Sequence, residues 1–314
     1  MIKLCVLVIV TAVLSGCAGD TAHNPPPDSP PPPLSTPQIE SSPAPVTPPQ
    51  SASSPHGQQP KPPDETEPYI ETVVMDAAQS ILVPGMSEFD MVKAAFDHII
   101  ENTVLDDPIG LDIWRIRGGH GGGIPSFVEN RSLSVLLFGV GMCEDYAAAL
   151  TVLLRAMGLR AQYVPGLTYA ADGSGFVDHA WVTAEVDGLW YHLDVQLEQN
   201  ITRQGRIRYR YFMKGDATMS ASHRWGQNLI DSRLLTPEQN HEISRDFIHE
   251  PCPRDYPEQP PHIFEPGTPP DIPALTAAIE DELRIYEAEH GMLPPLEQNI
   301  IPPVFALAGY PPIP

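Results

Sequence analysis

The sequence predicts a domain of the α+β class with a proline-rich segment on each side. Apolar residues recur at helical spacing up to about residue 158, and strand-like alternation dominates the stretch after it. Of the 38 prolines, 17 fall in residues 18–68 and 16 follow residue 250, which leaves only five in residues 69–250. We therefore predict a folded domain over residues 69–250 and expect the chemistry of the chain there.

The N-terminus has the pattern of a secretory signal. A short basic start is followed by an apolar run from Leu4 to Leu14, and this run is too short to span a bilayer comfortably. Residues 1–16 are therefore predicted to be a signal peptide. The tetrapeptide Leu14-Ser-Gly-Cys17 resembles the bacterial lipobox, and the resemblance implies that Cys17 is acylated and anchors the protein outside the cytoplasm, at the bacterial cell membrane. An ordinary secretory signal with a chance cysteine is the alternative.

Residues 17–68 are predicted to form a tether. Their prolines lie among Ser, Thr, Gln and Ala, a composition that cannot bury a core and favours extended segments. The formal net charge of −22 argues against nucleic acid and anionic lipid as partners, because both require basic patches. Attachment to the membrane is therefore expected through the N-terminal lipid.

An amphipathic helix is predicted over residues 86–102. Ser87 and Asp90 resemble a capping box. The apolar stripe that follows consists of Phe89, Val92, Phe96 and Ile99. The glycine cluster at residues 118–123 is interpreted as a mobile loop, because no Lys-Ser/Thr pair follows it and no βαβ pattern surrounds it, as a phosphate-binding loop would require.

A second helix is predicted to begin at Cys143 and to end near Gly158, a natural C-cap. Its apolar face consists of Tyr146, Leu150, Leu153 and Met157. The unpaired N–H groups of a first helical turn favour a thiolate and can donate to an oxyanion. Glu144 and Asp145 oppose a thiolate, yet acids are also favoured at helix starts. Taken alone, Cys143 could equally be a buried, inert thiol.

Three strands are predicted after this helix. Residues 160–164 form the first, and residues 179–186 and 189–194 form a hairpin around the turn Asp187-Gly188. The turn sets a register in which Val186 faces Leu189, Thr183 faces His192 and Trp181 faces Asp194. His179 is then the diagonal neighbour of Asp194 on the same face, within reach of a ring and a carboxylate.

Together these elements offer a nucleophile, a base and an orienting acid. Asp194 would fix the tautomer of His179, and His179 would take the proton of Cys143. The resulting imidazolium would offset the two acids beside the thiol.

The same residues resemble a known family, the bacterial transglutaminase-like domain. The segments that carry the resemblance are Gly141-Met-Cys143-Glu-Asp-Tyr-Ala147, Arg155-Ala-Met-Gly158, Asp178-His179-Ala-Trp181 and Asp187-Gly-Leu-Trp190-Tyr-His-Leu-Asp194. The resemblance covers about residues 69–225. It implies a papain-like cysteine protease fold, with the nucleophile helix packed on an antiparallel sheet, and a triad of Cys143, His179 and Asp194. Asp145 and Val182 depart from the residues common at those positions, glycine and asparagine.

The other polar and aromatic candidates are assigned structural roles or left open. His192 is expected to be a half-buried polar partner, and Trp181 and Trp190 are candidates for a substrate groove or for core packing. No zinc site or other cofactor is expected, because the remaining histidines show no metal-ligand spacing with each other or with Cys252. These histidines are His120, His223, His241 and His249.

Outside the cytoplasm, Cys143 and Cys252 could also form a disulfide. In the C-terminal extension, residues 251–314, one helix is predicted through Leu275, Ile279 and Leu283 to end near Gly291.

The predicted function is thiol-dependent acyl transfer from a peptide or side-chain amide, with cell-wall peptides among the candidate substrates. Water as the acceptor gives a peptidase or amidase, which we favour, and a lysine gives a cross-linking transglutaminase. Two other classes remain: a non-catalytic module that binds peptide or cell wall, and a lipid-anchored structural spacer.

Overall fold

We describe the fold from a computed structural model. The residues that it describes are 69–118, 125–170, 173, 175–202, 204–226 and 250–293. The predicted signal peptide, the lipidation site at Cys17 and the tether lie outside these residues. So do most of the glycine cluster and the histidines at 120, 241 and 249. No helix in the described part of the chain is long and apolar enough to cross a membrane.

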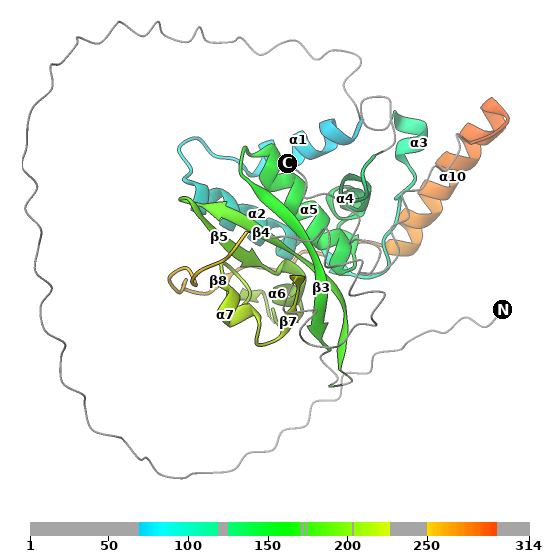
Figure 1. The fold of residues 1–314 in the computed structure, drawn as a ribbon. Helices are drawn as coiled ribbons and strands as arrows, with labels where there is room; N and C mark the ends of the chain where they lie inside the picture. Colours follow the sequence, from blue (N-terminus) through cyan, green and yellow to red (C-terminus); the bar gives the residue numbers. More distant parts are fainter. Residues whose placement is uncertain are drawn as a thin grey trace, which may run out of the picture. The chain divides into compact units, whose positions relative to one another are not determined.

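Helices and a small sheet make up the domain (Figure 1). The helices are α1 (Tyr69–Ile81), α2 (Glu88–Asn102), α3 (Trp114–Arg117), α4 (Phe127–Phe138), α5 (Cys143–Ala156), α6 (Val195–Ile201), α7 (Asp216–Met219) and α10 (Ile272–His290). The strands are β1 (Val104–Leu105), β2 (Val140–Gly141), β3 (Ala161–Tyr169), β4 (Phe176–Val186), β5 (Leu189–Leu193), β6 (Arg206–Ile207), β7 (His223–Arg224) and β8 (His262–Ile263).

The central sheet has four strands in the order β5-β4-β3-β7, and all neighbours are antiparallel. The predicted hairpin register is confirmed, with Val186 paired to Leu189 and Thr183 to His192. The first strand is longer than predicted, because β3 pairs with β4 from Ala161 through Tyr169. The predicted α+β class is therefore correct, with the helix that begins at Cys143 beside an antiparallel sheet.

Alternation along β4 separates the two faces of the sheet. Ala180, Val182 and Ala184 belong to the main apolar core, where they meet Leu150 and Leu153 of α5. Trp181 points to the opposite face and packs with a separate cluster of Val164, Met219 and Trp225. This division places α5 on one side of the sheet and a polar, aromatic cluster on the other.

Capping boxes form at the N-termini of two helices, α2 and α4. The predicted capping box at α2 is confirmed, since the Ser87 hydroxyl accepts from the Asp90 amide and the Asp90 carboxylate accepts from the Ser87 amide. A second capping box, Ser126 with Glu129, starts α4. Helix α4 packs beside α5, and this contact brings Arg131 of α4 to the first turn of α5.

The chain after residue 250 returns to the domain. The Cys252 carbonyl accepts from the Asp216 amide, Tyr256 stacks on Phe89 at 4.6 Å, and β8 pairs with β6. Farther on, α10 ends at Gly291, whose φ of 83° is the left-handed C-cap conformation, as predicted from the sequence. Cys143 and Cys252 are both free thiols, so they do not form the disulfide considered above.

Candidate active site

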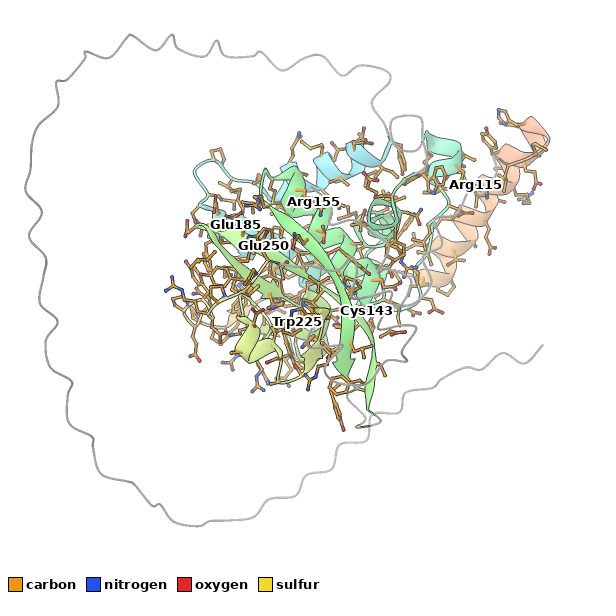
Figure 2. All side chains as sticks on the ribbon, in the orientation of Figure 1. Arg115, Cys143, Arg155, Glu185, Trp225 and Glu250 are labelled. Atoms are coloured by element: carbon orange, nitrogen blue, oxygen red, sulfur yellow. The ribbon has the colours of Figure 1, made fainter. Side chains whose placement is uncertain are left out.

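Cys143 is the first residue of α5 and is partly exposed. Figure 2 shows it at one end of the helix, with Arg155 near the other end. The backbone packs closely where the chain enters this helix, since a Cβ added at Gly141 would lie 2.6 Å from Cβ of Asp145. As a first-turn residue, Cys143 has a backbone N–H without a helical acceptor, and this N–H is available to an oxyanion.

His179 and Asp194 form a buried pair beside this turn. His179 Nε2 lies 2.6 Å from Asp194 Oδ2, the diagonal contact predicted from the hairpin register. Asp194 directly follows β5 and caps α6, and its Oδ1 accepts from the Leu197 amide at 2.9 Å. Because Nε2 of His179 is committed to Asp194, Nδ1 is the ring nitrogen that remains for the Cys143 thiol.

The charges of the three groups are coupled. Burial lowers the pKa of His179, but the Asp194 carboxylate and the Cys143 side chain outweigh burial and raise this pKa to about 10. Burial also acts to raise the pKa of Asp194, and the His179 and His223 rings outweigh it and hold that pKa well below its usual range. Asp194 is therefore an anion at neutral pH, and His179 is poised to carry a proton.

The two acids after Cys143 are held by a cation that sequence reasoning missed. Arg131 lies 2.7 Å from Asp145 through Nε and 3.2 Å from Glu144. Asp145 is fully buried, and its Oδ2 also accepts from the Met142 amide at 2.8 Å. Burial raises the pKa of Asp145 to about 7 against the opposing charge of Arg131. Arg131 therefore offsets much of the negative charge that the sequence places beside the thiol.

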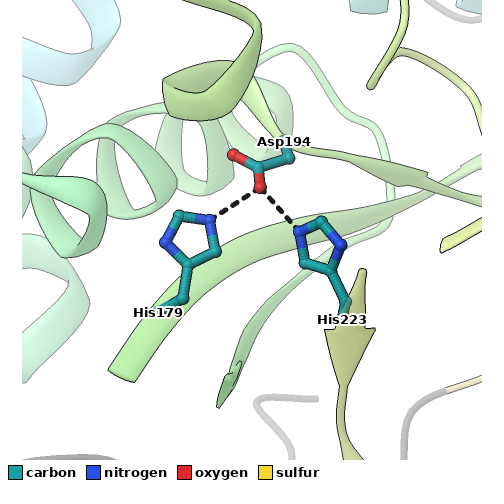
Figure 3. Close-up of side chains that lie close together, drawn as sticks. All are labelled: His179, Asp194 and His223. Carbon is teal, nitrogen blue, oxygen red and sulfur yellow. Dashed lines mark hydrogen bonds and ion pairs between the residues drawn. The ribbon is translucent and has the colours of Figure 1, made fainter. Parts of the chain in front are cut away.

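A second histidine shares the carboxylate of the pair. His223 of β7 is fully buried, and its Nε2 lies 2.9 Å from Asp194 Oδ2, the atom that His179 also contacts (Figure 3). No spacing in the sequence signals this contact, because His223 reaches Asp194 only through the pairing of β7 with β3. His223 is a functional candidate that sequence reasoning left unassigned.

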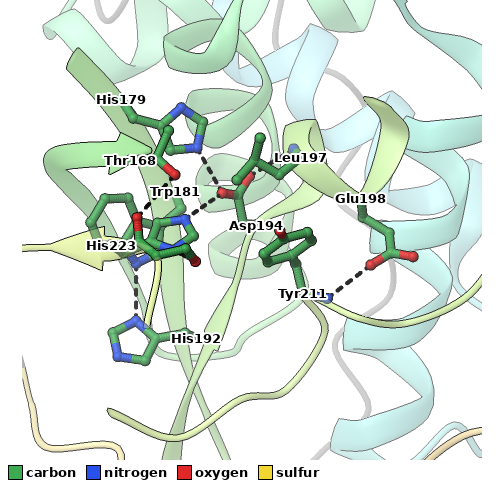
Figure 4. Close-up of polar contacts among 10 residues, drawn as sticks. Thr168, His179, Trp181, His192, Asp194, Leu197, Glu198, Tyr211 and His223 are labelled. Atoms are coloured by element: carbon green, nitrogen blue, oxygen red, sulfur yellow. Dashed lines mark hydrogen bonds and ion pairs between the residues drawn. The ribbon is translucent and has the colours of Figure 1, made fainter. Parts of the chain in front are cut away.

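His192 belongs to a neighbouring polar chain. Its Nδ1 accepts from the indole N–H of Trp181 at 2.9 Å (Figure 4). Its Nε2 lies 2.9 Å from Asp216 Oδ1. His192, Asp216 and Cys252 are close enough to one another to hold a metal ion. However, an indole only donates, so Nε2 of a neutral His192 carries the proton and has no lone pair for a metal. The geometry therefore favours a hydrogen-bonded role, and His192 is fully buried instead of half-buried.

The two tryptophans proposed for a substrate groove are core residues. Trp181 is fully buried on the sheet face away from α5, and Trp190 is buried near the Asp187-Gly188 turn, below the Arg160 guanidinium at 5.1 Å. Neither ring is open to a substrate, so this expectation is corrected in favour of core packing. The reason is the hairpin alternation, which turns Trp181 toward Met219 and Trp225.

Tyr163 is a further group near the thiol. Its hydroxyl is buried and has no hydrogen-bond partner among the described residues. Burial raises the pKa of Tyr163, and the charges of Glu144 and Cys143 raise it further, so the phenol lies within electrostatic reach of the thiol. A buried polar atom without a partner is uncommon and calls for a physical reason.

A family model accounts for the segment that holds these residues. Residues 76–195 match the transglutaminase-like superfamily. The matched segment includes Cys143, His179 and Asp194, and it covers 120 of the 314 residues. Members of this superfamily are typically cysteine-dependent enzymes. No curated protein matches the chain in sequence.

Several solved structures align with part of the chain. A protein proposed to be a cysteine protease, from Cytophaga hutchinsonii, is 17% identical over 42% of this chain and 39% of that chain, with a TM-score of 0.29. A TGase is 21% identical over 40% and 31%, with a TM-score of 0.28. The arylamine N-acetyltransferase NAT3 from Bacillus cereus, described with a Cys-His-Glu catalytic triad, is 18% identical over 42% and 50%, with a TM-score of 0.29. The chain thus spans half or less of the length of these proteins.

Proposed function

We propose that the domain is a thiol enzyme that acts on peptide or side-chain amides through Cys143, His179 and Asp194. The observation that carries the proposal is the arrangement of His179, whose Nε2 is fixed by Asp194 while the Cys143 side chain acts on the same ring. A base oriented by a buried acid and placed beside a thiol at a helix start is the arrangement that activates a cysteine nucleophile.

The reaction proceeds in two acyl transfers. The Cys143 thiolate attacks the amide carbonyl, and the backbone N–H of Cys143 donates to the oxyanion, with the Tyr163 hydroxyl as the candidate second donor. The C–N bond then breaks, His179 gives its proton to the leaving amine, and an acyl thioester remains on Cys143. Water attacks the thioester while His179 takes up a proton, and the acid and the free thiol are released.

Hydrolysis is the reaction we favour, and transfer to an amine is the second candidate. Glu144 and Asp178 lie on the two elements that present Cys143 and His179, and the charge of Asp178 contributes, after burial, to the raised pKa of Glu144. Two carboxylates at the mouth of the site would attract a cationic amine such as a lysine side chain. Incubation with casein and a fluorescent alkylamine separates the two, because both reactions release ammonia or an amine in the first step but only transfer attaches the fluorescent amine to the protein.

Thiol labelling tests the proposed enzyme without a known substrate. At pH 7, iodoacetamide is expected to alkylate Cys143 at least about tenfold faster than Cys252, which is fully buried and whose pKa is raised by burial. His179→Ala should slow the labelling of Cys143 and narrow the difference, while the labelling of buried Cys252 stays slow. His262→Ala is the matched control, since His262 contacts Glu101 at 2.7 Å, outside the Cys143, His179 and Asp194 cluster. Equal, slow labelling of both cysteines in the unmodified protein would favour the non-catalytic binding module.

We also propose that the protein is a lipoprotein anchored at the extracytoplasmic side of a bacterial membrane. The support is the sequence pattern from Met1 to Cys17, with its apolar run and small residues before the cysteine. Labelled palmitate should enter the protein and be lost in Cys17→Ala, and the variant should leave the membrane fraction. Incorporation that persists in Cys17→Ala would reject the lipobox interpretation.

A further inference from the structure

The carboxylate of Asp194 is shared by two imidazoles. His179 Nε2 and His223 Nε2 approach the same oxygen, Oδ2, at 2.6 and 2.9 Å, and their ring centroids lie 5.7 Å apart. All three side chains are buried. Because the Leu197 amide donates to Oδ1, the carboxylate meets three donors in the described structure.

The hydrogen-bond partners of the two rings determine which ring nitrogens carry a proton. An ionised carboxylate only accepts, so both Nε2 atoms carry hydrogen. Nδ1 of His223 lies 2.9 Å from the Ser222 hydroxyl. A neutral His223 with its proton on Nε2 accepts at Nδ1, so the Ser222 hydroxyl donates there. A hydroxyl can donate to this nitrogen or accept from it, so Nε2 of His223 donates to Asp194 in either case.

We propose that His223 is a positioning residue that lowers the proton affinity of His179 by sharing the Asp194 carboxylate. This inference rests on the proposed function. A carboxylate that accepts an additional hydrogen bond is a weaker base, so it stabilises the imidazolium form of His179 less strongly. An imidazolium held less tightly gives its proton more readily to the leaving amine.

Other titratable groups act on this cluster from neighbouring elements. His179 is influenced by Cys143 from α5 and by Asp194. Asp194 in turn influences the Tyr211 phenol, whose pKa is raised first by burial and then by the charges of Asp194 and Glu198. Tyr211 also packs edge-to-face on His223, with ring centroids 6.0 Å apart, and His223→Phe keeps a ring for this contact. A change in the titration of His179 then reports the lost donor.

The test is the titration of His179 in the full chain, followed by the Cε1–H signals of labelled histidines in NMR spectra and assigned with His179→Gln. His223→Phe removes the donor and keeps a ring of similar size, and His223→Gln keeps an amide N–H near the position of Nε2. The titration midpoint of His179 should rise by about one pH unit in His223→Phe, which is a tenfold rise in proton affinity. It should return toward the original position in His223→Gln.

An unchanged titration midpoint of His179 in folded His223→Phe would overturn the proposal and leave His223 a purely structural residue. If His223→Phe does not fold, Ser222→Ala provides the second measurement. This substitution frees the tautomer of His223 and should raise the titration midpoint of His179 by a smaller amount. An unchanged midpoint would again overturn the proposal. Failure of the proposed function is distinguished by Cys143→Ala, which would then leave the titration of His179 unchanged.

Discussion

Replacing Asp145 by asparagine should change how the stability of the protein depends on pH. Asp145 is fully buried, and burial raises its pKa from the ordinary value of 3.8 to about 7. Between these values the unfolded chain has lost the proton and the native protein keeps it, so the stability contributed by this group falls as the pH rises. At 1.36 kcal/mol per pH unit, the interval corresponds to about 4 kcal/mol.

The assay is urea unfolding of the unmodified protein and of Asp145→Asn at several values between pH 4 and pH 8. The difference in the free energy of unfolding, unmodified minus variant, should decrease by up to about 4 kcal/mol from pH 4 to pH 7 and then level off. Asp76→Asn, at an exposed position of α1, is the matched control. A difference that stays constant across this range would refute the reasoning, because it would mean that Arg131 compensates the burial of Asp145 completely.

Three further substitutions probe the packing of the site. Gly166→Ala should lower the free energy of unfolding by about 1–3 kcal/mol, measured in urea, because the added Cβ would meet the Trp181 ring and a backbone carbonyl of β7 at less than 3 Å. Trp181→Phe should cost about 1–3 kcal/mol in the same assay, since Nδ1 of buried His192 loses its donor. Tyr163→Phe should leave stability unchanged or raise it, because the hydroxyl has no partner among the described residues, while amide turnover falls if it donates to the oxyanion. Loss of stability in Tyr163→Phe would point to a hydrogen bond outside those residues.

Local pattern was enough to predict the hairpin. A two-residue turn and strict alternation leave only one register that keeps the apolar face buried, and this register brings His179 to Asp194. The helix that begins at Cys143 could be predicted for the same reason, because its apolar face and its C-terminal glycine are local signals.

The contacts that the sequence did not reveal are made between distant elements. Arg131 reaches Asp145 only because α4 packs beside α5, and His223 reaches Asp194 only because β7 adds to the edge of β3. Neither contact leaves a periodic signal in the chain. The role of Trp181 was ambiguous for a related reason, since an aromatic residue on an alternating strand fits a groove and a core equally well until the layer over that face is known.

The segment after residue 250 has a consequence for the order in which the protein forms. His262 contacts Glu101 across 161 residues of chain, and Tyr256 stacks on Phe89 of the same helix, α2. Contacts of such sequence separation form late, because the intervening chain must be closed first. During synthesis, α2 therefore leaves the ribosome well before the residues that pack on it. The nascent chain is expected to expose the aromatic surface of Phe89 until residue 256 has emerged.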